Sequence, residues 1–334
     1  MKSVKKIVLW LLVVALLAAA AAVGAAWYWV TSPLRLQQTP AIFTVEPGAR
    51  LRTIAQAMNA AGISIHPEAL VLLGRYTGDD TRLRAGTYQA IEGDTPLSLL
   101  ERMARGEMVQ SRLTLVEGWT YQRIRNALRE HPDVRQTLGD VSDKDLLERL
   151  GSPQNHPEGL FYPDTFVFAP GTPDFDVLNQ SYKAGQTLLE TLWNERKPDL
   201  PLKSPYEALI LASIIEKETG MAADRERVAG VFINRLRTGM PLQTDPTVIY
   251  GMGDAYQGRI RKKDLQTDTP WNTYTRPGLP PTPIASPGRA ALVAALNPEE
   301  HDYYYFVARG DGSSEFSKNL SEHNRAVRKF ILGK

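Results

Sequence analysis

The amino-acid sequence predicts an α+β protein with a single N-terminal transmembrane helix, a small βααβ module and a larger mixed α+β domain. An uncharged apolar run covers residues 7–30 and is long enough to cross a bilayer as a helix. After residue 113, helical patterns alternate with Pro- and Gly-rich connections and show no regular strand–helix rhythm, which is typical of α+β folds. The predicted boundaries are 1–6 for a cytoplasmic tail, 7–30 for the transmembrane helix, 31–40 for a polar tether, 41–112 for the module and 113–334 for the larger domain.

Composition narrows the classes of function. The 334 residues are 43% hydrophobic and 23% charged, as in globular proteins, and the net charge of +2 argues against nucleic acid as a partner. Cysteine is absent, which excludes disulfides, thiolate metal sites and cysteine nucleophiles. The five histidines form no close metal-ligating pair, and no nucleotide-binding or serine-hydrolase motif occurs. We therefore expect no metal and no cofactor, and any catalysis should use carboxylates.

The charges around the apolar run predict its orientation. Lys2, Lys5 and Lys6 precede the run and Arg35 follows it, so the N-terminus is expected in the cytoplasm and the rest of the chain outside. A signal-peptide apolar region is usually about 7 to 15 residues long, so the length of this run favours a retained anchor. The alternative is a cleaved signal peptide, because the Ala-rich stretch 18–26 offers small-residue cleavage sites.

A strand-type dipeptide, a glycine-containing turn and a helical pattern recur three times after the tether. The turns contain Glu46-Pro47-Gly48, Glu92-Gly93 and Glu117-Gly118. The segment 43–55, around the first turn, resembles the start of a LysM domain, a βααβ module that in its family binds glycans containing N-acetylglucosamine. Residues 60–62 suit a helix end and residues 67–76 can supply the second helix. A module with a purely structural role is the alternative.

The clearest helix of the larger domain is predicted over residues 205–219. Pro205 suits its first turn and Gly220 its C-cap. The helix is apolar nearly all round, which predicts that it lies in the core. A second helix is expected from Asp224, acting as N-cap, through Leu236.

Three segments combine aromatic and polar residues with turn formers: 158–166, 242–251 and 271–281. A sugar presents apolar ring faces and hydroxyl edges, so a glycan groove needs flat aromatic side chains together with amide, hydroxyl and carboxylate groups. The three segments supply that mixture. On composition alone, turn-forming residues with aromatic side chains packed beneath the loops are the simpler explanation.

Taken in order, these motifs resemble the membrane-anchored endolytic murein transglycosylases of bacteria. The resemblance covers nearly the whole chain and rests on 158–165, Ala-Ser-Ile-Ile-Glu-Lys-Glu-Thr at 212–219, 231–236, Leu-Gln-Thr-Asp-Pro-Thr-Val-Ile-Tyr-Gly at 242–251, 272–274, 305–308 and 316–324. It implies an enzyme that cleaves peptidoglycan glycan strands internally, between N-acetylmuramic acid and N-acetylglucosamine, and leaves 1,6-anhydro ends. It also implies a single-pass protein of the bacterial inner membrane, with residues 113–334 as a periplasmic catalytic domain and cell-wall synthases (penicillin-binding proteins) as partners.

The resemblance assigns catalysis to Glu218. The expected substrate-binding residues are Gln243, Thr244, Asp245, Tyr250, Asn272, Tyr274, Glu158 and Asp164. A lytic transglycosylase can use a single carboxylic acid, which protonates the glycosidic oxygen and then takes the proton from the C6 hydroxyl of the same sugar. A glycoside hydrolase would need a second carboxylate, for which Asp245 is the best candidate. The alternative from another class is a membrane-tethered scaffold that binds peptidoglycan without catalysis.

Helix geometry separates Glu218 from its neighbour Glu216. Two residues apart on one helix, their side chains point about 200° from each other, so only one can face a given groove. Glu218 is expected on the last turn, where the negative end of the helix dipole and partial burial should both raise its pKa. Glu216 is expected to pair with a cation or to cap a neighbouring loop.

The anchor prediction can be tested with a reporter fused after Lys334. We expect the reporter to lie outside the cytoplasm, because the lysines before the apolar run hold the N-terminus inside. Protease accessibility in spheroplasts measures this. Recovery of a soluble mature chain that begins near Ala26 would instead identify the run as a cleaved signal peptide.

Overall fold

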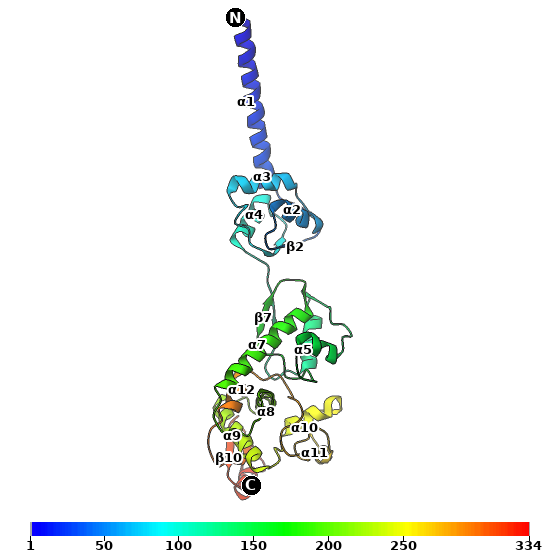
Figure 1. Cartoon of the computed structure of the whole chain (residues 1–334), viewed down its shortest axis with the longest axis vertical. Helices are drawn as coiled ribbons and strands as arrows, with labels where there is room; N and C mark the ends of the chain where they lie inside the picture. Colours follow the sequence, from blue (N-terminus) through cyan, green and yellow to red (C-terminus); the bar gives the residue numbers. More distant parts are fainter. Residues whose placement is uncertain (1, 334) are drawn as a thin grey trace. The chain divides into compact units, whose positions relative to one another are not determined.

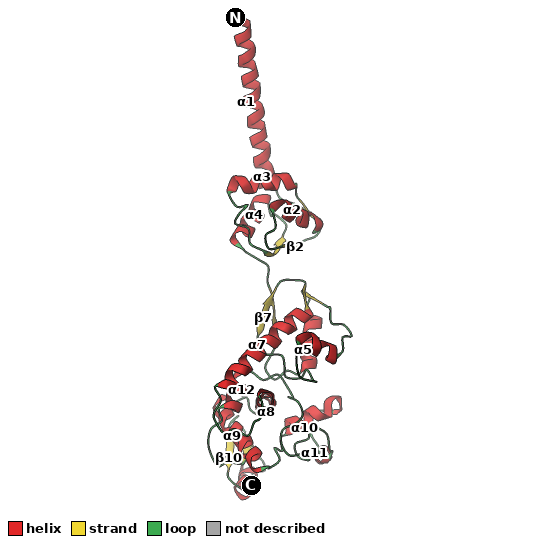
Figure 2. Ribbon diagram, viewed as in Figure 1, coloured by secondary structure: helices red, strands yellow, loops and turns green. Residues whose placement is uncertain are grey.

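The computed structural model describes residues 2–333, and side chains from Lys5 onward; Met1 and Lys334, the outer ends of the predicted tail and larger domain, lie outside the described residues. The chain divides into two compact units, one ending at Ser111 and the other beginning at Arg112. The fold is mixed α+β: helices form most of the regular structure, and the strands are short (Figure 2).

The first unit contains the long apolar helix and the small module. Its elements are α1 (Lys2–Thr31), β1 (Arg35–Leu36), β2 (Ala41–Val45), α2 (Leu51–Ala60), β3 (Ile63–Ser64), α3 (Pro67–Thr77), β4 (Gly86–Ala90) and α4 (Pro96–Arg105). Within α1, the stretch Lys5–Thr31 is long enough to span a membrane, and an 18-residue window within it has a mean hydropathy of 2.8. This helix suits a single-pass anchor or a signal sequence.

The segment expected as a tether, 31–40, takes part in the fold of the first unit. Within it, β1 pairs antiparallel with β3, and Leu36 lies opposite Ile63. The N–H of Leu34 donates to the carbonyl of Asp94 at 2.7 Å. Trp29, at the end of α1, also packs against the module core, and α1 contacts α4. The apolar helix is therefore packed directly onto the module.

The module has the order strand, helix, helix, strand. Strand β2 pairs antiparallel with β4, and Phe43 lies opposite Tyr88. Along β2 the side chains are alternately buried and exposed, as expected for a strand that covers a core on one face. The buried face of α2, which includes Ile54 and Met58, packs into the same core.

Each of the three predicted strand–turn–helix units is present: β2 leads into α2, β4 into α4, and β5 (Ser111–Thr114) into α5 (Tyr121–Glu130). The third residue of every turn is a glycine with positive φ: Gly48 at 75°, Gly93 at 92° and Gly118 at 76°. Each turn is closed by a hydrogen bond from the N–H of its fourth residue to the carbonyl of its first, Ala49 to Glu46 (3.0 Å), Asp94 to Ile91 (3.1 Å) and Trp119 to Val116 (3.2 Å). This is the geometry in which a side chain at the third position is strained.

The second unit holds the remaining elements. They are β5, α5, β6 (Val134–Arg135), α6 (Asp143–Leu150), β7 (Thr165–Phe168), β8 (Thr172–Pro173), α7 (Asp174–Asn194), α8 (Pro205–Glu218), α9 (Ala222–Thr238), α10 (Asp245–Met252), the short 3-10 helix η1 (Gly253–Ala255), α11 (Lys262–Gln266), α12 (Arg289–Leu296), β9 (Tyr305–Ala308), β10 (Ser314–Ser317) and α13 (Leu320–Phe330). Strand β5 neighbours β7, β6 pairs parallel with β8, and β9 pairs antiparallel with β10.

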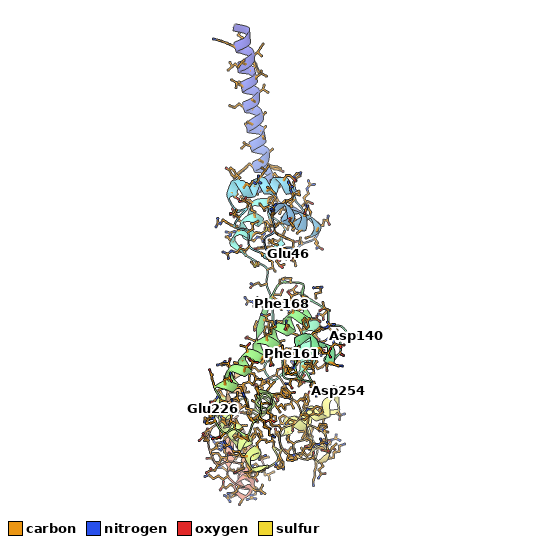
Figure 3. The ribbon with its side chains drawn as sticks, viewed as in Figure 1. Glu46, Asp140, Phe161, Phe168, Glu226 and Asp254 are labelled. Atoms are coloured by element: carbon orange, nitrogen blue, oxygen red, sulfur yellow. The ribbon has the colours of Figure 1, made fainter. Side chains whose placement is uncertain are left out.

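Helix α8 lies at the centre of the second unit. It contacts α7, α9, α10 and α12, and every residue from Ala208 to Ile215 is buried (Figure 1). In the same unit, Phe161 is fully buried, whereas Asp140 and Glu226 are exposed at the surface (Figure 3). The burial of α8 confirms the prediction of a core helix over this segment.

Two predicted helix ends differ from the observed ones. Helix α8 ends at Glu218, and Thr219, in extended conformation, is its C-cap in place of Gly220. Helix α9 begins at Ala222, with Met221 as N-cap. Asp224 lies within the first turn of α9, and its carboxylate accepts a hydrogen bond from the N–H of Ser314 at 2.6 Å. The carboxylate expected to cap the helix therefore makes a contact with a distant segment instead.

The turn geometry predicts different costs for two glycine substitutions in the second unit. Gly118→Ala should lower the free energy of unfolding by about 1–2 kcal/mol, because a Cβ at positive φ is strained. Gly220→Ala is the matched control: no atom lies within 4 Å of the added Cβ, and the φ of Gly220 is outside the left-handed region. Urea unfolding of the full chain in detergent measures both, and an equal loss in the two variants would contradict this account.

Candidate active site

The end of α8 places one carboxylate at a pocket. The helix starts with Ser204, whose hydroxyl accepts the N–H of Glu207 at 3.2 Å, and with Pro205 in its first turn. It ends at Glu218, since Thr219 turns the backbone to φ −137° and ψ 124°. The carboxylate is thus carried by the last residue of a rigid, buried helix.

Burial dominates the electrostatics of Glu218. Loss of water raises the pKa of its carboxyl to about 7; a hydrogen bond from Thr244 lowers it, the charge of Asp245 raises it, and the charge of Arg235 lowers it. The Thr244 hydroxyl donates to Oε1 of Glu218. A carboxyl in these surroundings can hold a proton at neutral pH and can also release it.

The loop before α10 is held in a strained conformation next to Glu218. Gln243 has φ of 47°, in the left-handed region, which is unfavourable for a residue with a side chain. Its N–H donates to the carbonyl of Thr273 at 3.1 Å, and the N–H of Thr244 donates to the hydroxyl of Thr273 at 3.1 Å. Thr247 donates to the carbonyl of Thr244 at 2.7 Å. These hydrogen bonds fix the conformation of the loop whose Thr244 hydroxyl donates to Glu218.

The pocket beside Glu218 has a volume of about 360 Å³ and mixes aromatic, acidic and hydrogen-bonding side chains. Its lining is Glu218, Phe232, Arg235, Leu242, Gln243, Asp245, Tyr274, Tyr305, Phe306, Leu320 and His323. Ring faces alongside polar groups suit a ligand with apolar faces and hydroxyl edges. Of the sequence-predicted binding residues, Gln243, Asp245 and Tyr274 line this pocket, and Thr244 bonds to Glu218 beside it.

Tyr274 lines the pocket and Asn272 does not, although they are only two positions apart in the sequence. The hydroxyl of Tyr274 donates to Asp245 at 2.7 Å, and burial followed by this bond raises its pKa. Asn272 is fully buried and does not line the pocket. Its amide donates to the carbonyls of Asp264, Leu265 and Thr267 and accepts the N–H of Tyr274 at 2.9 Å. It therefore holds together the loop that carries Tyr274.

Arg235 is a pocket residue that the sequence analysis did not single out. The residue is 6% exposed, and its guanidinium donates to the carbonyls of Leu242 at 2.6 Å and Tyr304 at 2.7 Å. It also lies over the ring of Tyr305, at 5.2 Å from the centroid. Burial lowers its pKa. The motif 231–236 contained Arg235, but only its contacts with β9 and with the loop 241–244 before α10 (the 242 loop) identify its place.

Glu158 and Tyr250 form a separate cluster away from the pocket lining. Glu158 is 4% exposed; it accepts the N–H of Tyr121 at 2.9 Å, at the start of α5, and the hydroxyl of Tyr250 at 3.1 Å. Burial raises the pKa of Glu158 to about 7, whereas these hydrogen bonds lower it. Burial also raises the pKa of Tyr250, whose ring packs edge-on against Trp271. Glu158 thus links α5 to α10.

Asp164 belongs to neither group. It is exposed, its carboxylate accepts the N–H of Thr165 at 2.7 Å, and its carbonyl accepts the N–H of Leu115 at 2.9 Å.

Glu216 points to a different neighbour from Glu218. Its carboxylate accepts the N–H of Gly288 at 3.1 Å, and Gly288 is the N-cap of α12. Burial raises its pKa, and the bond from Gly288 lowers it. Glu216 therefore caps a neighbouring helix, as the two-residue spacing suggested. Among the residues that the structure describes, no group of three or more His, Cys, Asp or Glu side chains could hold a metal ion.

A larger hollow of about 720 Å³ lies in the first unit, between the turn 46–50 and the segment 80–85. Charged side chains contribute much of its wall, including Glu46, Arg50, Arg75 and Asp80. The carboxylates in its lining, those of Glu46 and Asp80, are both exposed to water. The candidate catalytic site is therefore the smaller pocket at Glu218.

Comparisons with known proteins agree on one family. The YceG-like family matches residues 43–329. The chain is 31% identical to a Bacillus subtilis protein named endolytic murein transglycosylase, over 89% of this chain and 86% of that protein. It is 27% identical to a Streptococcus pneumoniae protein of the same name, over 87% of this chain but only 58% of that longer protein. A crystal structure of a YceG-like protein from Listeria monocytogenes is similar, with a TM-score of 0.54, 28% identity, and coverage of 85% of this chain and 97% of that one.

The surroundings of Glu158 predict a pH-dependent stability. Its pKa is about 7 in the folded protein and 4.5 when unperturbed, so the folded state keeps a proton that the unfolded chain loses between these values. Stability should therefore fall as pH rises from about 4.5 to 7, by about 3 kcal/mol. Glu158→Gln should remove this part of the slope in urea unfolding curves, and the raised pKa values of Glu218 and Glu216 should contribute to the slope that remains.

Asp164→Asn, at an exposed side chain in the same segment, is the matched control. We expect it to leave the slope as in the parent chain. A slope that is unchanged by Glu158→Gln would show that the carboxyl titrates as in water.

Proposed function

The chain belongs to the YceG-like family, and we propose that it is an endolytic transglycosylase that cleaves peptidoglycan strands between N-acetylmuramic acid and N-acetylglucosamine and leaves 1,6-anhydro ends. Such cleavage would limit the length of nascent strands. The observation that carries the proposal is Glu218, a carboxyl of raised pKa at a pocket lined by aromatic and hydrogen-bonding side chains. A pKa near 7 leaves part of the carboxyl protonated at neutral pH, as a general acid requires.

In the proposed mechanism, Glu218 acts twice. It first gives its proton to the glycosidic oxygen, and the bond from that oxygen to C1 of N-acetylmuramic acid breaks. The C6 oxygen of the same sugar then bonds to C1, and its proton passes to the Glu218 carboxylate. The acid is regenerated, no water is consumed, and the attacking hydroxyl has the high effective concentration of a tethered group.

The neighbours of Glu218 would support these two steps. Thr244 donates to the carboxylate, which stabilises the ionised form between the steps. Arg235 adds positive charge that favours the same form. Gln243 and the pair Tyr274–Asp245 offer groups that can bind sugar hydroxyls.

Three of the remaining predicted binding residues have supporting positions in this proposal. Glu158 and Tyr250 hold α10, whose first residue is Asp245, and Asn272 holds the loop of Tyr274. Asp164 is exposed on another segment.

Asp245 favours a second candidate function. It lines the same pocket as Glu218 and could act as the second carboxylate of a glycoside hydrolase. The products separate the two reactions, because an anhydro end is one water lighter than a hydrolytic end.

The first unit would bring the enzyme to its substrate. We propose that α1 is a single-pass anchor in the bacterial inner membrane, with the N-terminus in the cytoplasm and the catalytic unit in the periplasm. The order of β2, α2, α3 and β4 resembles a LysM module, and its hollow is the place where it would hold glycan. No aromatic side chain occurs in the lining of this hollow, so binding there would rely on polar contacts. Cell-wall synthases are proposed as partners.

Glu218→Gln in the full chain should lower strand cleavage at least about 100-fold, because the variant keeps the shape of the side chain but cannot deliver the proton. Cleavage is measured by mass spectrometry of purified glycan strands, with no added metal. The parent chain should release ends that are one water lighter than reducing ends. Reducing ends alone would favour the hydrolase.

Glu216→Gln is the matched control on the same helix. It should keep cleavage within about tenfold of the parent, because Glu216 lies outside the pocket and a glutamine oxygen can still accept the N–H of Gly288. Parent-level cleavage by a folded Glu218→Gln protein would refute the catalytic assignment.

A further inference from the structure

One wall of the pocket comes from the C-terminal helix, and the proposed mechanism does not use it. Leu320 and His323 lie three residues apart on α13, hence on one face of the helix, and both line the pocket that contains Glu218. Phe306 of β9 lines it as well. Leu320 is 55% exposed, so its side chain is accessible to a ligand in the pocket.

The ring of His323 is held in place by stacking. Its plane lies 25° from that of Tyr305, with the centroids 5.2 Å apart. The guanidinium of Arg235 also lies over the ring of Tyr305, 5.2 Å from its centroid. The imidazole is therefore oriented before any ligand binds.

The two nitrogens of His323 differ in access. Nδ1 is enclosed and has no hydrogen-bond partner among the described residues, whereas Nε2 is not enclosed. A proton on Nδ1 would leave a buried N–H unpaired, so the tautomer with the proton on Nε2 is favoured. Burial, followed by the charge of Arg235, lowers the pKa of His323, so the ring is neutral at pH 7. His323 thus offers the pocket one neutral N–H donor.

We propose that His323 Nε2–H donates a hydrogen bond to an amide carbonyl oxygen of the glycan strand, while Leu320 and Phe306 contact the apolar group attached to that carbonyl. His323 is then a specificity-determining residue of the pocket, and this inference rests on the proposed function. A neutral acceptor fits better than an anion, because Glu218 and Asp245 line the pocket and the guanidinium of Arg235 already donates to the carbonyls of Tyr304 and Leu242. Peptidoglycan has two such groups near the scissile bond, the acetamido group and the lactoyl amide of the stem peptide. The methyl of an acetamido group matches the apolar side chains of the wall.

The test uses the full chain in detergent, with Glu218→Gln present so that strands bind without being cut. His323→Phe keeps a ring on Tyr305 but has no donor, and we expect the Kd for glycan strands to rise about 3- to 15-fold. His323→Gln keeps an N–H donor at a similar reach and should restore most of the affinity. Circular dichroism and thermal unfolding verify the fold of both variants. If His323→Phe does not fold, the Kd of His323→Gln is compared with that of His323→Leu, which also lacks a donor.

Three strand preparations identify the carbonyl: intact strands, strands freed of stem peptides by an amidase, and strands with the acetyl groups removed. The acetamido carbonyl is identified if His323→Phe binds peptide-free strands more weakly than the parent does but binds deacetylated strands equally well. The reverse pattern identifies the lactoyl amide.

Two outcomes would overturn the inference. The first is unchanged affinity of His323→Phe for intact strands. The second is an equal deficit on all three preparations, because the loss would then not depend on an amide carbonyl. Failure of the proposed function is seen separately, as the absence of anhydro ends from strands treated with the chain that retains Glu218.

Discussion

The burial of α8 against its neighbouring helices is the packing interaction on which the second unit depends. Every residue from Ala208 to Ile215 is buried, and four other helices pack against this one. Each large aliphatic side chain buried in this way contributes about 1.5–3 kcal/mol. Because α8 ends at Glu218, the packing that stabilises the unit also fixes a carboxylate at the boundary between core and pocket. Partial loss of water at that boundary raises its pKa, so the proposed acid chemistry follows from the same burial.

Hydrogen bonds of hydroxyl and amide side chains to the backbone help to hold the loops around that carboxylate. The hydroxyl of Thr273 accepts the N–H of Thr244 and lies 2.9 Å from the hydroxyl of Thr247, and Asn272 binds three carbonyls of the preceding loop. Each such bond contributes only about 0.5–1.5 kcal/mol, but a buried group left unpaired would cost more. The network therefore supports the strained backbone of Gln243 without placing further charge beside Glu218.

Among the described residues of this unit, Glu158 and Glu218 have pKa values of about 7, and Glu218 is the one that lines the pocket of about 360 Å³. Glu158 is enclosed by the N–H of Tyr121 and the hydroxyl of Tyr250, where it joins two helices. Glu218 opens onto the pocket. A raised pKa therefore identifies burial in both cases, and access to a ligand separates a structural carboxyl from a candidate acid.

Local pattern was enough to predict the long apolar helix, the three glycine turns, the buried helix that begins at Pro205, and the different surroundings of Glu216 and Glu218. Each depends on residues within a few positions of one another, where helix period and turn geometry act directly. Local pattern could not predict which of the expected binding residues line the pocket and which lie outside it. Tyr250 bonds to a carboxylate 92 positions away, and Arg235 joins the 242 loop to β9. Such contacts depend on how distant segments pack, and no spacing along the chain encodes that packing.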